Sequence, residues 1–84
     1  MLSKKTKYAI NALVYLAKKP PKEPVLISEI AEHEHIPKKF LETILLDLRN
    51  AGILNSKKGK GGGYYLIKHP ADVNLAEIVR YFDG

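Results

Sequence analysis

Apolar residues recur along the chain with the spacing of helices that bury one face. The clearest case is residues 38–50, where apolar side chains spaced i, i+3, i+4 and i+7 form one stripe: Leu41, Ile44, Leu45 and Leu48. The opposite face is polar except for one leucine, and it carries Lys39, Glu42, Thr43, Leu46 and Asn50. Gly52 follows as a residue suited to ending the helix, because glycine adopts the left-handed conformation without strain. The pattern predicts an amphipathic helix over residues 38–50.

Three further segments have helical patterns and recognisable ends. Residues 3–18 begin at Ser3, a good N-cap residue, and their wide apolar band indicates packing against more than one neighbour. Residues 28–34 begin at Ser28, which we expect to cap a short acidic helix. Residues 74–82 begin at Asn74, with Glu77 placed three residues later as in a capping box.

The pattern changes after residue 52. Residues 53–68 contain two short apolar and aromatic runs separated by a glycine-rich basic segment, which predicts a β-hairpin. The second and third helices, joined by a short turn at Pro37, predict a helix-turn-helix, and the hairpin that follows predicts its wing. The expected fold is therefore mainly α with a small β-hairpin: one winged helix-turn-helix domain over residues 1–84.

Length and composition narrow the range of functions. A chain of 84 residues forms one small domain and leaves no room for a large enzyme. The absence of cysteine excludes disulfides, thiolate metal sites and cysteine nucleophiles in this chain. There is no apolar run of about 20 residues that could span a membrane, and the N-terminus does not resemble a signal peptide. We therefore expect a cytoplasmic protein with no membrane association.

The net charge of +5 is unevenly distributed. Residues 1–22 and 57–69 contain lysines without acidic residues, whereas residues 23–36 contain glutamates without lysine or arginine. Separated basic blocks are typical of a protein that binds a polyanion such as nucleic acid. Lysine is also a common solubilising residue, so charge alone leaves both interpretations open.

Several features have a second interpretation. The glycine-rich segment lacks the Gly-Lys-Ser/Thr ending of a phosphate-binding loop and leads into a strand, so we do not expect nucleotide binding. His33 and His35 point apart on a helix, and without a third ligand we expect a solvated helix end and no metal site. Leu46 either contacts a thymine methyl group or is a stray exposed leucine. The wide band of the first helix leaves dimer packing open.

The sequence resembles the Rrf-two family of bacterial winged-helix transcription regulators over essentially all 84 residues. That family includes the iron–sulfur cluster regulator, the nitric-oxide-sensing repressor and the cysteine-metabolism repressor. The resemblance rests on the first helix, the recognition helix, the wing and the helix after it: residues 2–9, 36–42 with 48–52, 58–64, and 74–79 with 83–84. It implies a sequence-specific DNA-binding transcription regulator rather than an enzyme.

We also expect particular residues to contact double-stranded DNA. For Lys39, Phe40 and Glu42 the resemblance implies the contact, and for the others the expectation rests on their charge or on the close approach that glycine allows. In the major groove these are Lys38, Lys39, Phe40, Glu42 and Thr43. In the wing they are Lys58, Lys60, Gly61 and Gly62, and in the first helix Lys4, Lys5 and Lys7. Three positions depart from the common family pattern: Phe40 replaces Tyr, Lys58 replaces Arg and Lys60 replaces Pro.

Partners and cofactors follow from the same resemblance. Two copies are expected to bind a pseudo-palindrome as a homodimer. Family members usually continue with a long dimerisation helix, and sensor members place a cysteine cluster just beyond residue 84. We therefore expect no cofactor in this chain, and an iron–sulfur cluster only if a C-terminal segment supplies ligands. The alternative is a winged helix that binds protein and not DNA. A small enzyme would need a pocket with convergent titratable groups, which the sequence does not offer.

Overall fold

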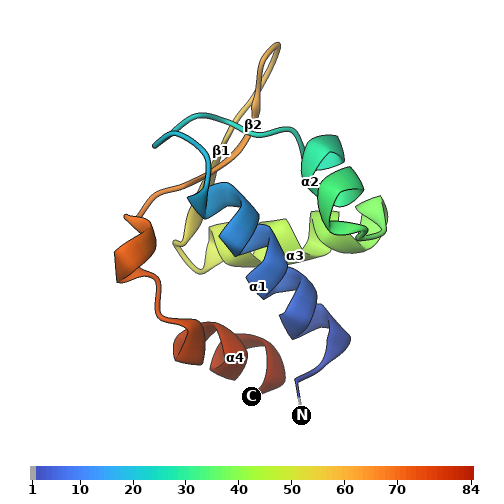
Figure 1. The fold of residues 1–84 in the computed structure, drawn as a ribbon, viewed down its shortest axis with the longest axis vertical. Helices are drawn as coiled ribbons and strands as arrows, with labels where there is room; N and C mark the ends of the chain where they lie inside the picture. The colour runs from blue at the N-terminus through green and yellow to red at the C-terminus, as the bar shows by residue number, and fades with distance from the viewer. Residues whose placement is uncertain (1) are drawn as a thin grey trace.

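The computed structural model describes residues 2–84, and this part of the chain forms four α-helices, one antiparallel hairpin and a short 3-10 turn (Figure 1). In chain order the elements are α1 (Lys4–Ala17), α2 (Ile27–Glu34), α3 (Lys38–Asn50), β1 (Leu54–Lys57), β2 (Gly63–Leu66), η1 (Pro70–Asp72) and α4 (Leu75–Asp83). The predicted fold, mainly α with a small hairpin, is confirmed. Each helix lies within one residue of its predicted bounds.

The core is built around α1, which crosses the middle of the molecule (Figure 1). This helix contacts α2, α3, α4 and β2, in agreement with the wide apolar band of its sequence. The apolar stripe of α3 is completely buried, as are the single large side chains that α2, β1 and α4 contribute: Leu41, Ile44, Leu45, Leu48, Ile30, Leu54 and Ile78. Burial of this apolar surface is the main force holding the helices together.

Three helix ends match the sequence prediction. The Ser3 hydroxyl accepts the N–H of Thr6 at 3.1 Å, and the Asn74 side chain accepts the N–H groups of Ala76 and Glu77 at 2.9 and 3.3 Å. At the end of α3, Gly52 has φ +81°. There the N–H of Ile53 reaches back to the carbonyl of Leu48, and the N–H of Gly52 to that of Arg49, each at 3.0 Å, which is a Schellman motif.

The prediction that Ser28 caps α2 is wrong. The helix begins one residue earlier, and its N-cap is Leu26, whose side chain makes no capping hydrogen bond. The reason is a long-range one: Val25 pairs with Tyr64 of β2 through two backbone hydrogen bonds of 2.8 and 2.9 Å. This pairing fixes the backbone just before α2, and the N–H groups of Glu29 and Ile30 then both donate to the Leu26 carbonyl.

Two other local predictions need correction. Glu77 makes no reciprocal side-chain hydrogen bond to Asn74 among the residues described, so the N-terminus of α4 has a cap but no capping box. Residues 70–72 form a 3-10 turn that the sequence reading missed. His69 caps this turn, because its Nδ1 accepts the N–H of Ala71 at 3.1 Å.

The hairpin is shorter than predicted, and it projects from the helical body as a wing (Figure 1). Its register runs from Leu54 opposite Leu66 to Lys57 opposite Gly63, so residues 58–62 form the tip. The bridge between Val25 and Tyr64 ties β2, one residue from its tip-side end, to the segment that leads into α2. The wing and the helix-turn-helix are therefore held in a fixed relation by backbone hydrogen bonds.

The turn between α2 and α3 is equally well defined. His35 ends α2 in the left-handed conformation with φ +54°, and the N–H of Ile36 donates to the Ala31 carbonyl at 3.0 Å. Ile36 is buried in the core, and Pro37 then serves as the N-cap residue of α3. A buried side chain and a proline in the middle of this turn fix the angle at which α3 leaves α2.

Candidate nucleic-acid interface

The outer face of α3 is exposed along its whole length. Its solvent-facing side chains are Lys38, Lys39, Glu42, Thr43, Leu46, Arg49 and Asn50. Four of these positions, 39, 42, 43 and 46, are spaced i, i+3, i+4 and i+7 and so lie on one stripe of the helix. This is the spacing with which a helix lying in the major groove presents side chains to successive base edges.

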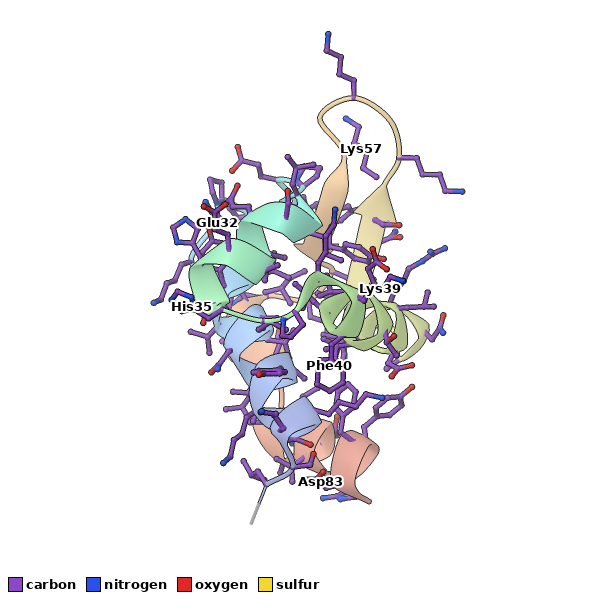
Figure 2. All side chains as sticks on the ribbon, turned by 90° about the vertical axis from the view of Figure 1, so that its right-hand side faces the viewer. Glu32, His35, Lys39, Phe40, Lys57 and Asp83 are labelled. Carbon is purple, nitrogen blue, oxygen red and sulfur yellow. The ribbon has the colours of Figure 1, made fainter. Side chains whose placement is uncertain are left out.

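The N-terminal end of α3 is electropositive. Lys38 and Lys39 occupy its first turn, which contains no acidic residue, and no side chain caps its free N–H groups. Figure 2 labels Lys39 on this helix, with the wing rising above it. A helix start of this kind attracts phosphate groups.

The wing carries three exposed lysines, Lys57, Lys58 and Lys60, beside glycines at its tip. Gly61 has φ +75° and faces open space, so it lets the backbone approach a partner closely. Gly62 lies in a different environment from Gly61. It is buried, and its N–H donates to the Gly59 carbonyl at 3.0 Å, so it shapes the turn and offers no free donor to a phosphate.

The three predicted lysines of α1 are not equivalent. Lys4 and Lys7 are exposed. The ammonium group of Lys5 instead lies 3.1 Å from a carboxylate oxygen of Asp47 on α3 and 5.5 Å from the centre of the Phe82 ring on α4. Lys5 therefore links three helices, and the charge predicted to approach a phosphate is already paired.

Phe40 is half-buried and anchors the start of α3. Its ring meets the Tyr8 ring of α1 edge-to-face, with centroids 5.5 Å apart. Such a pair stabilises a contact beyond the burial of its area. Figure 2 places Phe40 beside the first turn of α3, close to Lys39. Phe40 thus fixes the position of the first-turn lysines, and only its exposed portion is available to DNA.

A polar cluster that sequence reasoning missed joins the end of α1 to α2. The Tyr15 hydroxyl donates to a carboxylate oxygen of Glu29, and the Lys19 ammonium lies 2.7 Å from the same oxygen. The Lys19 ammonium also lies 5.1 Å from the centre of the Tyr15 ring. The centres of the Tyr15 and His33 rings are 5.2 Å apart. His33, which we expected at a solvated helix end, is exposed, and its ring lies beside that of Tyr15.

The charges of this cluster stabilise one another. The hydrogen bonds from Lys19 and Tyr15 lower the pKa of the Glu29 carboxyl, and the same carboxylate raises the pKa values of Tyr15 and Lys19. No sequence motif indicates the cluster, because it depends on how α1 and α2 cross. It holds the first helix of the helix-turn-helix against α1.

No three His, Cys, Asp or Glu side chains within residues 2–84 are grouped so that they could hold a metal ion. No helix in the same range is long and apolar enough to cross a membrane. Figure 2 shows Lys39 of α3 and Lys57 of the wing on the same side of the molecule.

A helix-turn-helix with an exposed polar second helix and a basic wing defines the class of winged-helix transcriptional regulators. The chain belongs to one family within that class, the Rrf2 family, described as iron-dependent transcriptional regulators, which it matches over residues 2–84. The resemblance noted in the sequence is thereby confirmed.

Individual relatives support this assignment. The chain is 47% identical over 87 residues to a Rhodobacter capsulatus protein named as an rrf2-like HTH-type transcriptional regulator. The match covers 100% of this chain and 58% of that protein. It is 32% identical to the HTH-type transcriptional regulator CymR of Bacillus subtilis, covering 99% of this chain and 60% of CymR. This chain thus spans somewhat more than half the length of these relatives.

Solved structures give the same result. The structure of CymR, the global cysteine regulator of B. subtilis, superposes on the whole chain with a TM-score of 0.93 at 32% identity, and the chain covers 65% of it. The IscR structure from T. potens gives a TM-score of 0.91 at 33% identity, and the chain covers 61% of it. These relatives are transcription regulators, which favours the DNA-binding interpretation over a protein-binding winged helix.

Proposed function

We propose that this domain binds double-stranded DNA sequence-specifically and regulates transcription in the cytoplasm, with no catalytic activity of its own. In the proposed complex α3 lies in the major groove and the wing contacts the flanking backbone or minor groove. The observation that carries the proposal is the polar, exposed stripe of α3 beside a basic wing, held in a fixed relation by the bridge between Val25 and Tyr64.

The distribution of ion pairs supports this arrangement. Within residues 2–84 the two ion pairs use Lys5 and Lys19. The lysines at the start of α3 and in the wing are exposed and take part in neither pair: Lys38, Lys39, Lys57, Lys58 and Lys60. Their charge is therefore available to phosphate groups, together with that of Lys4 and Lys7 on α1.

The proposal includes a homodimer on a pseudo-palindromic operator. Helix-turn-helix proteins commonly bind as dimers to half-sites one helical turn, or a multiple of it, apart. Each copy would present one α3 to one half-site, so that the symmetry of the DNA follows that of the protein.

The first prediction concerns salt. With about three to four phosphates neutralised per copy, the logarithm of the binding constant should fall against the logarithm of salt concentration with a slope of about −3 to −4 per monomer. A fluorescence-anisotropy titration at several salt concentrations measures this slope. A flat response would contradict the proposed function.

The second prediction separates affinity from specificity. Replacing Lys58 and Lys60 by alanine should weaken binding to all sequences alike and make the salt slope shallower by about two, because each lysine contacts backbone phosphate. The matched control replaces Lys18 and Lys22, two exposed lysines in the turn after α1, and changes net charge equally. An equal loss in both variants would show that the wing makes no specific contact.

The third prediction concerns Glu42. Its carboxylate can accept a hydrogen bond from a cytosine amino group, so Glu42→Gln should change the preferred base at one position of each half-site by about tenfold. Competition binding with operators altered one base pair at a time measures this preference. Glu32→Gln makes the same chemical change on the exposed face of α2 and should leave the sequence preference unaltered. An unchanged preference in Glu42→Gln would remove Glu42 from the set of base-reading residues.

A further inference from the structure

Leu46 is an isolated apolar side chain on the outer face of α3. It is 46% exposed, whereas the leucine before it, Leu45, is completely buried. All four of its neighbours one turn away on this helix are exposed polar residues: Glu42, Thr43, Arg49 and Asn50. Single exposed leucines are common on protein surfaces, so exposure alone assigns no role. The position of Leu46 within the stripe is what gives it meaning.

Leu46 lies on the stripe that begins at Lys39 and continues through Glu42 and Thr43. The rise of 1.5 Å per residue in an α-helix places Leu46 about 10 Å beyond Lys39 along the axis, or about three base-pair steps. The other members of the stripe offer an ammonium, a carboxylate and a hydroxyl group. Leu46 alone offers only hydrocarbon to a base edge.

We propose that Leu46 is a specificity-determining residue that contacts the 5-methyl group of a thymine in each half-site; this inference rests on the proposed function. The thymine methyl is the only apolar group that base pairs present in the major groove. Against any other edge the leucine would cover a hydrogen-bond donor or acceptor and leave it unpaired, which is unfavourable. Leu46 therefore selects thymine both by attraction and by exclusion of the other bases.

The test removes the methyl group and nothing else. An operator is first selected from a random DNA pool, and each thymine beneath α3 is then replaced singly by deoxyuridine. The wild-type domain should lose affinity about fourfold at one thymine of each half-site, as expected for one buried methyl group. In Leu46→Ala the thymine and deoxyuridine operators should bind equally. Leu46→Met, which keeps a long apolar side chain, should retain most of the discrimination.

The chain offers a closely matched control. Leu75 on α4 is 47% exposed, and α4 lies on the far side of the molecule from the wing (Figure 1). Leu75→Ala removes the same atoms from an equally exposed site and should keep the wild-type response to deoxyuridine. Neither alanine variant should unfold the domain, because both leucines are exposed and alanine favours helix.

The outcomes separate this inference from the proposed function. Salt-dependent, sequence-selective binding with no loss at any deoxyuridine overturns the role of Leu46 and leaves the DNA-binding function intact. The same holds if Leu46→Ala keeps the full discrimination, or if the base pairs beneath α3 are all G·C. If only the N-terminal end of α3 entered the major groove, Leu46 would not reach a base, and no deoxyuridine substitution would weaken binding. Absence of selective, salt-dependent binding overturns both.

Discussion

Replacing Leu45 by alanine should lower the free energy of unfolding by about 3 kcal/mol. Leu45 is completely buried in the core between α3 and the rest of the domain, so the variant loses both the transfer of the side chain from water and the contacts around the cavity left behind. In a domain of this size the melting temperature falls by about 4–8 °C for each kcal/mol. Thermal and urea denaturation followed by circular dichroism measure the loss.

The neighbouring leucine provides the control for this variant. Leu46→Ala makes the same chemical change one residue later on the exposed face, and stability should stay within about 0.5 kcal/mol of the wild type. For DNA binding we expect the opposite order, with the larger effect in Leu46→Ala. Well below its melting temperature, Leu45→Ala should bind the operator as the wild type does, whereas Leu46→Ala should lose the response to the thymine methyl. Equal losses of stability would mean that α3 does not present these two faces as described.

Elements that bury one face could be predicted closely from the sequence. The apolar stripe of α3 predicted both the bounds of the helix and its buried residues. Apolar residues spaced three and four apart lie on one face of an α-helix, and that face packs against the core. The caps at Ser3 and Asn74 and the Schellman motif at Gly52 were predictable for a similar reason. Each depends on residues within one turn of the chain.

Features that depend on distant pairing could not be predicted in this way. The start of α2 is set by Val25 pairing with Tyr64, and nothing near Ser28 in the sequence reveals that bridge. The same pairing explains why Gly63 is a glycine, since the Val25 carbonyl lies against it. Local propensity pointed to Ser28, and the geometry of the sheet overrode it.

The candidate site shows the same division. The exposed residues of α3 and the wing follow from the periodicity and from the turn, and they lie where the sequence placed them. The pairing of Lys5 with Asp47, the packing of Phe40 on Tyr8 and the ion pair of Glu29 each depend on how helices cross. Periodicity gives the face of a helix but not the neighbour that the face meets. The first two of these contacts hold α3 against α1, and the third holds α2 against the end of α1.

Gly63→Ala should be strongly destabilising, with a loss of about 3 kcal/mol or more. A Cβ atom at this position would lie 2.2 Å from the Val25 carbonyl oxygen, and φ is +152°, a conformation that residues with a side chain rarely adopt. Overpacking and backbone strain each cost about 1–3 kcal/mol. The bridge between Val25 and Tyr64 should open, so the N–H groups of both residues should lose their protection in hydrogen exchange.

Gly61→Ala is the control that separates backbone strain from a steric clash of the added Cβ atom. Gly61 also has a positive φ, +75°, but nothing lies within 4 Å of the Cβ that alanine would add. The left-handed conformation costs alanine about 1–2 kcal/mol, and the loss of freedom in the unfolded chain offsets about 0.4–1 kcal/mol of that. Gly61→Ala should therefore lose about 1 kcal/mol, clearly less than Gly63→Ala, and should keep the bridge protected. If both variants lost stability equally, backbone conformation alone would account for Gly63. If only Gly63→Ala also weakened DNA binding, the bridge would be what holds the wing in its DNA-contacting position beside α3.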